Sequence, residues 1–490
     1  MVSHYSELQG AFGREALYRP KRYRAKDLLS PLANPRLRVG ESDYPLVDIS
    51  TNGAALLLAS GGEAGWSAGD ELDAGLVVHG HELQRLRARV VRWEPSARGL
   101  RVGLSLTNGF IDLDAVRRLD AHKHLDHQLA TGPLARGALV PAEFRAAVSE
   151  AVHLVQYYRR CLEPHEAEAR ARGEEAVREL AQKTHSGLGS IYAELRERAS
   201  EAALGFLGDA KVMQAAKLYT ETVLTPLLLS SPMIERAYRK PLGYPGDYQV
   251  MLYYYANEFE GGSAFAKVFH KLFVEHPLSA GVCTRKDYVV GWMERELARV
   301  RATSKEVDFA VTSLGCGPAK EVSDFADTRS PWEGRIRWRL IDQEERTLQV
   351  AYEGAQRSLA SCGSQGSIEC LNLAFGQLLK NPALLERGGA QHFIYSTGLF
   401  DYLPVRTAQQ LIAALYSCLA PGGRMLIGSA KGPNRYFFCP EFVLDWSLIY
   451  RSRDEMLALT QGLPPDAHVE VELEPGGAYW FLQIRKGLAA

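Results

Sequence analysis

The sequence predicts a multidomain α/β protein with an antiparallel β-barrel in residues 1–118, a helical middle in 119–235 and a doubly wound, mainly parallel sheet in 236–490. A chain of 490 residues exceeds what one hydrophobic core usually supports. Glycine-rich turns separate short apolar runs near the N-terminus, and helically spaced apolar residues follow. From about residue 305, apolar strand-like runs alternate with helical segments. That alternation is typical of parallel strands buried on both faces.

Composition indicates a soluble globular protein, because 46% of the residues are hydrophobic and 23% are charged. The formal net charge is −1, so we expect neither a nucleic-acid polymer nor an anionic membrane as a partner. No apolar run is long enough to cross a bilayer, and the N-terminus has no signal-peptide core. The seven cysteines lack paired CxxC spacing and indicate free thiols. We therefore expect a cytoplasmic protein.

The barrel is predicted from short apolar runs at Pro45–Ile49, Ala54–Leu58, Leu76–Val78, Arg87–Trp93 and Leu100–Leu106. Between the first two runs, Asp48, Ser50 and Gly53 spell DxSxxG, which resembles the signature of PilZ domains, small barrels that commonly bind cyclic di-GMP. Upstream lies a basic arm, whose guanidinium groups suit a dianionic, guanine-bearing ligand.

The resemblance implies a cyclic di-GMP site made by Asp48, Ser50 and Gly53 together with the arm residues Arg19, Arg22, Arg24 and Lys26. One position departs from the family pattern of two arginines four apart, because Lys26 follows Arg22 at that spacing. A lysine cannot reproduce the bidentate, stacking contact of a guanidinium. The alternative is a plain barrel in which DxSxxG is only a turn and the arm is solvated.

In the middle region, Phe144, Val148, Val152 and Val155 share one face of a helix that Pro141 would start. Val289, Met293, Leu297 and Val300 repeat the pattern before the sheet, and the charged residues 162–200 predict a solvated helix or connector. A string of His122, His124, Asp126 and His127 spells HxHxDH, a zinc-binding pattern in some hydrolases. That pattern needs a buried strand before it, whereas Leu113–Ala121 predicts a charged helix, so we expect no metal site.

The sheet is predicted from seven apolar runs, the last two forming a hairpin: Val307–Leu314, Arg337–Ile341, Ser367–Leu373, Gln391–Tyr395, Arg424–Gly428, Val469–Leu473 and Tyr479–Ile484. The first run ends in Gly315 and Gly317, which let the backbone pass close to a ligand. Pro318 stands where a pyrophosphate would need a free N–H, and Asp342 ends the second run, where a carboxylate can accept both hydroxyls of a ribose. The pattern therefore favours a nucleoside without pyrophosphate over a dinucleotide; the alternative is a structural turn and a surface aspartate.

Several segments of residues 205–490 resemble S-adenosylmethionine-dependent methyltransferases of class I. More narrowly, GCGPAKEV, LIDQE, YSTGLFDYLPV, LAPGGRMLIGSAKGPN and the upstream KPLGYPGDY are similar to the family of 3-hydroxypalmitic acid methyl ester biosynthesis. The resemblance implies a Rossmann-like seven-stranded methyltransferase sheet with a helical lid, spanning residues 236–490, and S-adenosylmethionine as the cofactor.

Carried over by position, the resemblance also implies the cofactor contacts. Methionine would lie on the glycine turn and the sulfonium under the segment after the fourth strand, with the ribose and adenine at the ends of the second and third strands. Arg285 would bind the cofactor carboxylate, although a solvated arginine in a first helical turn is the plain alternative. The implied residues are Arg285, Gly315, Gly317, Asp342, Gln343, Asn372, Leu373, Ser396, Thr397 and Gly398.

Positioning of the reacting groups is assigned to the loop before a predicted helix, where Tyr244 and Tyr248 could face the sulfonium and exclude water. Arg239 and Lys240 could steer an acidic substrate. The alternative is a tight turn with tyrosines filling a core. The aromatics Tyr436-Phe-Phe438, Phe442 and Trp446 are candidates for an acyl-chain wall, or else plain core.

The predicted function is O-methylation of a small acidic acceptor of the hydroxy fatty acid type, modulated by cyclic di-GMP. No histidine or carboxylate pair stands in an obvious place for a general base, which favours an ionised carboxylate acceptor. Two alternatives stay open. One is methylation of a protein or another metabolite, and the other is a non-catalytic adaptor that binds cyclic di-GMP and S-adenosylmethionine.

Overall fold

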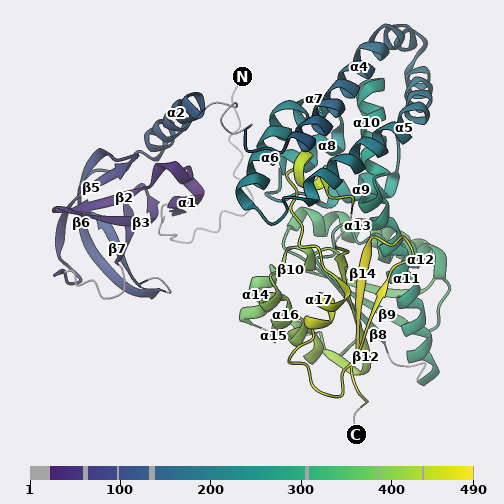
Figure 1. Ribbon diagram of the computed structural model, residues 1–490. Helices are drawn as coiled ribbons and strands as arrows, with labels where there is room; N and C mark the ends of the chain where they lie inside the picture. Colours follow the sequence, from purple (N-terminus) through teal and green to yellow (C-terminus); the bar gives the residue numbers. More distant parts are fainter. Residues whose placement is uncertain are drawn as a thin grey trace, which may run out of the picture. The chain divides into compact units, whose positions relative to one another are not determined.

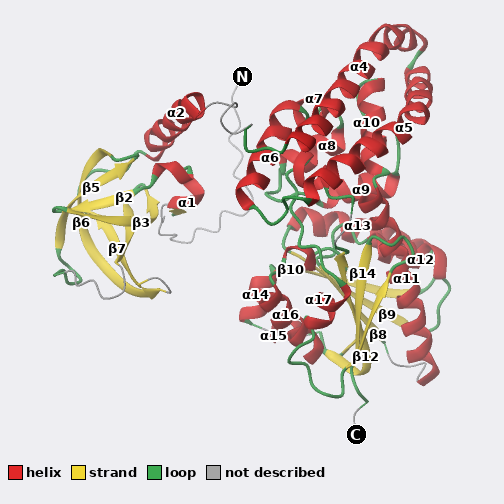
Figure 2. Ribbon diagram, in the orientation of Figure 1, coloured by secondary structure: helices red, strands yellow, loops and turns green. Residues whose placement is uncertain are grey.

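The computed structural model describes residues 22–58, 65–96, 99–131, 138–303, 308–381, 383–386, 388–432 and 435–488. The chain divides into two compact units, residues 1–136 and 137–490 (Figure 1). The first is built mainly of strands, and the second combines a helical layer with a sheet (Figure 2). Among the described residues, none of the helices combines the length and apolarity that a bilayer crossing requires.

The N-terminal unit contains a closed antiparallel barrel of six strands. Five of them lie at the predicted apolar runs, and the sixth, β2 (Arg36–Val39), was not predicted. The strands pair in the order β3-β2-β5-β6-β7-β4, and β4 closes the ring on β3, while β1 adds outside β3. Alternate residues such as Ile49, Leu56 and Leu104 fill its core. The strands are β1 (Tyr23–Arg24), β2 (Arg36–Val39), β3 (Ser42–Ser50), β4 (Gly53–Leu58), β5 (Glu71–Val78), β6 (His81–Ser96) and β7 (Gly99–Leu106), with α1 (Ala25–Leu28), η1 (Pro31–Ala33) and α2 (Leu113–Thr131).

The helical layer of the second unit begins directly after Pro141, and Phe144, Val148 and Val155 are buried as their spacing predicts. The charged stretch 162–200 belongs to two long helices, α4 and α5, which pack along each other. The helices are α4 (Ala142–Arg172), α5 (Glu174–Leu204), α6 (Ala210–Val223), α7 (Thr225–Leu228), α8 (Pro232–Arg239), α9 (Tyr248–Ala256), α10 (Ala264–Val274) and α11 (Pro277–Thr303).

The sheet has seven strands in the order β10-β9-β8-β11-β12-β14-β13. Neighbours from β10 to β12 are parallel, and β14 pairs antiparallel with both β12 and β13, which confirms the predicted final hairpin. The strands are β8 (Phe309–Leu314), β9 (Arg335–Asp342), β10 (Gln365–Asn372), β11 (Gln391–Ser396), β12 (Leu419–Ala430), β13 (His468–Leu473) and β14 (Tyr479–Arg485).

Helices cover both faces of this sheet. On one face, α11 packs through Val289 and Met293 beside α12 (Lys320–Arg329) and α13 (Glu345–Ser361). On the other face, α16 (Val405–Ser417) and α17 (Arg453–Ala458) bury Leu411 and Met456, with α14 (Phe375–Lys380) and α15 (Ala383–Glu386) nearby. Two short turns complete the unit, η2 (Phe400–Tyr402) and η3 (Cys439–Val443). The strand order reverses between β8 and β11, and open α/β sheets bind ligands in the crevice outside such a switch point.

Candidate functional site

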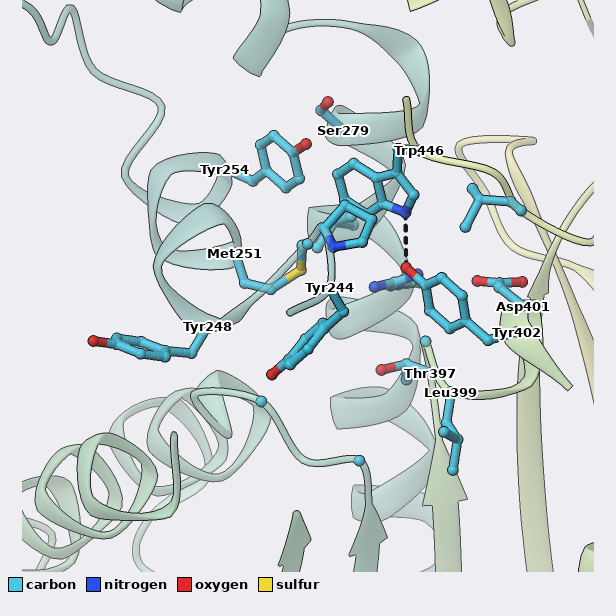
Figure 3. A pocket seen from close by; sticks show the side chains of 18 of the residues that line it. Tyr244, Tyr248, Met251, Tyr254, Ser279, Thr397, Leu399, Asp401, Tyr402 and Trp446 are labelled. Carbon is cyan, nitrogen blue, oxygen red and sulfur yellow. Dashed lines mark hydrogen bonds between the residues drawn. The ribbon is translucent and has the colours of Figure 1, made fainter. Parts of the chain in front are cut away.

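A cavity of about 380 Å³ opens at the carboxyl ends of β8, β9 and β11. The glycine turn and the ends of these strands line one side of the cavity, and α9, α11 and the segment after η3 line the other (Figure 3). The polar strand ends and the largely aromatic helical side therefore meet in one cavity, large enough for a small-molecule ligand.

The turn after β8 has the geometry that the sequence predicts for close ligand approach. Gly315 and Gly317 have φ values of 64° and 53°, in the left-handed region that favours glycine. The backbone N–H groups of Gly315 and Cys316 donate to the carbonyl of Ile341, which ties the turn to the end of β9. Both glycines line the cavity.

Asp342, the last residue of β9, is 8% exposed and lies beside this turn. Its carboxylate accepts hydrogen bonds from the Gly317 N–H at 3.1 Å and the Glu344 N–H at 3.1 Å. Burial raises the pKa of Asp342 above its ordinary value, and the backbone donors oppose the shift. The carboxylate is thus oriented by backbone at the cavity wall.

The other implied cofactor residues divide into two groups. Gln343, Leu373, Thr397 and Gly398 line the cavity. Two polar side chains instead support the strand ends, because Ser396 donates to the carbonyl of Leu314 at 2.8 Å and Asn372 donates to the carbonyl of Asp342 at 3.3 Å; neither is among the lining residues.

Arg285 is a buried side chain of α11 that lines the cavity, 8% exposed, and not a solvated arginine. Its guanidinium lies over the ring of Tyr479, 4.5 Å from the centroid. Within the described part of the chain it has no hydrogen-bond or ion-pair partner. Burial lowers the pKa of Arg285, but nearby groups, Asp401 and Glu321 among them, raise it overall. A buried cation that no hydrogen bond or ion pair engages suits an anionic ligand group.

The loop before α9 is held at both ends. Arg236 pairs with Asp247, which also caps α9 by accepting the N–H groups of Gln249 and Val250. Tyr244 and Tyr248 both line the cavity, and Figure 3 shows Tyr244 near its middle and Tyr248 at its edge. Burial, with the nearby charge of Asp342, raises the pKa of Tyr244, so its phenol remains protonated.

The two cations before that loop do not line the cavity. Arg239 is exposed and pairs with Glu235 on the same helix at 2.9 Å. Lys240 pairs with the carboxylate and the carbonyl of Asp445. Neither side chain therefore lies in the cavity wall, although both were predicted to steer an acidic substrate.

Of the two interpretations of the aromatics near 440, plain core holds for the phenylalanines. Phe437, Phe438 and Phe442 are buried in the helical core, where the ring centroids of Phe442 and Phe144 lie 4.8 Å apart. Only Trp446 of the predicted set lines the cavity. The apolar wall instead draws on aliphatic, sulfur-containing and aromatic residues of several helices, of the segment after η3 and of the start of β14: Met233, Met251, Tyr254, Phe273, Leu278, Val282, Leu444, Leu448 and Tyr479.

Two buried carboxyl groups in the cavity were not predicted. Glu321, in the first turn of α12, is 4% exposed, and burial raises its pKa to about 6. Asp401, in η2, is 3% exposed, and burial likewise raises its pKa. The sequence gives no periodic signal for either residue, although Glu321 lies within the quoted segment GCGPAKEV and Asp401 within YSTGLFDYLPV.

The DxSxxG motif of the barrel spans the β3–β4 turn. Asp48 is buried and pairs with Arg22 at 2.9 Å and with Arg101 of β7, and Ser50 donates to the carbonyl of Gly53. Arg24 and Lys26 are exposed, and Arg19 lies outside the described residues. Arg101 is a second guanidinium at the motif that the sequence analysis did not identify.

The HxHxDH string lies on α2, as expected for a helical segment. Across the described ranges, no group of histidine, cysteine, aspartate and glutamate side chains is arranged to hold a metal ion.

No protein-family model and no curated protein matches the sequence. Solved structures that resemble it include magnesium protoporphyrin IX methyltransferase (ChlM) from Synechocystis PCC 6803 with bound SAM, at 14% identity, covering 43% of this chain and 82% of that chain, with a TM-score of 0.30. N-methyltransferase NodS from Bradyrhizobium japonicum WM9 is 17% identical, with coverage of 40% and 95% and a TM-score of 0.27. A possible exported protein from Bordetella parapertussis is 16% identical, with coverage of 63% and 97% and a TM-score of 0.35.

Proposed function

We propose that the unit of residues 137–490 is an S-adenosylmethionine-dependent methyltransferase. The observation that carries this proposal is one cavity at the switch point of the sheet, in which the Gly315–Gly317 turn, the Asp342 carboxylate and the buried Arg285 guanidinium meet. These three features match a nucleoside that carries an amino acid, because they offer close backbone approach, an acceptor for ribose hydroxyls and a partner for a carboxylate.

When bound, S-adenosylmethionine would supply an activated methyl group, and the chain itself would position and desolvate the reactants. Asp342 would hold the ribose and Arg285 the carboxylate. Tyr244 would exclude water beside the glycine turn. Calorimetric titration of the purified protein with S-adenosylhomocysteine tests this assignment, and the absence of binding would contradict it.

We further propose that the acceptor is a small molecule with an apolar body, of the hydroxy fatty acid type. The apolar side of the cavity supports this choice, since Met233, Phe273 and Leu444 offer no polar group. Incubation with 3-hydroxy fatty acids and mass spectrometry for the gain of one methylene test it. Methylated protein in a lysate, with no methylated fatty acid, would favour the alternative of a protein acceptor.

For the barrel, we propose cyclic di-GMP binding at the DxSxxG motif. The pairing of Asp48 with both Arg22 and Arg101 supports it, because two guanidinium groups then lie at the motif, one from the arm and one from β7. Titration with cyclic di-GMP tests this role. If cyclic di-GMP does not bind, the barrel would be a structural module. The alternative of a non-catalytic adaptor that binds cyclic di-GMP would then be excluded as well.

A further inference from the structure

Asp401 presents one carboxylate oxygen to the cavity while the other is fully engaged. Oδ1 accepts hydrogen bonds from the Ser429 hydroxyl at 2.9 Å and from the Ala430 N–H at 2.7 Å. Oδ2 has no hydrogen-bond partner among the described residues, and Asp401 lines the cavity. Figure 3 shows this carboxylate beside the ring of Tyr402. Asp401 therefore offers a free acceptor atom to the cavity, within electrostatic reach of the Arg285 guanidinium.

The backbone around Asp401 is fixed by a second buried residue, Arg451. Its guanidinium donates to the carbonyls of Phe400 at 2.7 Å and Leu403 at 2.6 Å, and to the Ser429 hydroxyl at 3.0 Å. Arg451 thus holds both ends of the short turn that carries Asp401, and it shares Ser429 with Oδ1. A carboxylate so constrained keeps its direction without a ligand.

The charges of the cavity wall are unbalanced toward acids. Among its described lining residues, Glu321, Asp342 and Asp401 are acidic, and Arg285 alone carries a permanent positive charge. If Arg285 holds the carboxylate of the cofactor, no cation among these lining residues is left to pair with a carboxylate that stands as the reacting group of the acceptor. A carboxylate acceptor would then face Asp401 in a buried site, where like charges repel strongly.

We propose that the methylated atom of the acceptor is an uncharged hydroxyl oxygen or amine nitrogen, and that Asp401 takes its proton. This inference rests on the proposed methyltransferase function. It reverses the expectation of a carboxylate acceptor, which depended on finding no base in the sequence.

Methyl transfer from S-adenosylmethionine to the acceptor atom conserves atoms and charge. A lone pair of the acceptor atom forms the bond to the methyl carbon, the carbon–sulfur bond breaks, and its electron pair goes to sulfur, which loses its positive charge. The proton of the hydroxyl or amine passes to Oδ2 of Asp401 and then to solvent. No oxidant or further reactant is needed.

Other ionisable groups of the cavity fit this role less well. His276 accepts the Leu278 N–H at Nδ1, and burial lowers its pKa well below the usual range, so it is a poor proton acceptor. Glu321 lies in the helix that follows the glycine turn, on the side assigned to the cofactor. Burial raises the pKa of Tyr254 and of Tyr402, so both phenols remain hydrogen-bond donors.

Binding of two probes to the complex with S-adenosylhomocysteine tests the inference without turnover. Octan-1-ol and octanoate share an apolar chain and differ in charge. We expect octanoate to bind about tenfold more weakly than octan-1-ol in the natural protein. In Asp401→Asn the amide oxygen can still accept from Ser429 and Ala430, and we expect the preference to fall to about threefold or less. Preference for octanoate in the natural protein, or an unchanged preference in Asp401→Asn, overturns the inference.

Controls separate this inference from the proposed function. Asp454→Asn makes the same change at an exposed position of α17 and should leave the preference intact. If Asp401→Asn does not fold, tighter binding of octanoate than of octan-1-ol by the natural protein still overturns the inference. Failure of the natural protein to bind S-adenosylhomocysteine would remove the methyltransferase proposal itself, whereas binding of that ligand with tighter binding of octanoate would remove only the role of Asp401.

Discussion

The indole nitrogen of Trp446 donates a hydrogen bond to the phenol oxygen of Tyr402 at 2.7 Å. The same indole lies so close to Gly246 that a Cβ at that position would overlap its six-membered ring. The segment after η3, the turn after β11 and the loop before α9 therefore meet at one aromatic side chain over the cavity. Access of an acceptor to the site depends on how these three segments pack.

Gly246→Ala is expected to disturb that packing. Gly246 has φ 71° and Gly243 has φ 87°, but a Cβ at Gly243 would meet no atom within 4 Å. Both variants carry the left-handed strain of about 1–2 kcal/mol, and only Gly246→Ala adds a clash of about 1–3 kcal/mol. The melting temperature and the rate of methyl transfer should both fall further in Gly246→Ala than in Gly243→Ala. Equal losses in the two variants would contradict this role for Trp446.

Arg285→Met is expected to lower the affinity for S-adenosylhomocysteine about 100-fold, because a buried charge-assisted contact to the carboxylate of that ligand is lost. Methylthioadenosine lacks the amino-acid group and should bind both proteins alike. Arg295→Met, at an exposed arginine of the same helix, is the matched control. Calorimetry on the two ligands decides the matter, and an equal loss for both would place Arg285 elsewhere than at the carboxylate.

Glu321 gives the stability a specific pH dependence. Burial raises its pKa from 4.5 to about 6 in the folded protein, so the folded state binds its proton more tightly than the unfolded state does. The contribution of the protonated Glu321 carboxyl to the free energy of unfolding is fully present below pH 4.5 and is lost as the pH rises through about 6. The free energy of unfolding of Glu321→Gln should therefore exceed that of the natural protein by about 2 kcal/mol at pH 8 and should equal it at pH 4.5. Denaturant titrations at both pH values measure this difference, and an equal effect at the two would contradict it.

Arg22→Ala is expected to lower cyclic di-GMP affinity at least about tenfold, because it removes one guanidinium from the DxSxxG turn. Arg38→Ala provides the control, since Arg38 is exposed on β2 and pairs with Asp43 at 2.7 Å. Calorimetric titration distinguishes the variants. Equal affinity in all three proteins would leave Arg22 as a structural partner of Asp48.

The sequence predicted the parts of this structure that depend on local pattern. The apolar runs gave the strands of the sheet and the barrel, and the glycine turn with Asp342 followed from the ends of β8 and β9. Asp401 could not be identified in this way, because its role arises from Ser429 and Ala430, which β12 brings beside it. The phenylalanines near 440 could not be assigned from sequence for the same reason, since their spacing suits a wall or a core and the neighbouring Phe144 decides for a core.

In the proposed methyltransferase, Asp342 and the glycine turn together hold the nucleoside of S-adenosylmethionine, and the affinity of S-adenosylhomocysteine for Asp342→Asn measures the contribution of Asp342. The amide oxygen can still accept one of the backbone N–H groups, so the fold should persist, while the charged acceptor for the ribose hydroxyls is lost. We predict micromolar binding by the natural protein and about 100-fold weaker binding by the variant. Equal affinity in the two proteins would contradict the account.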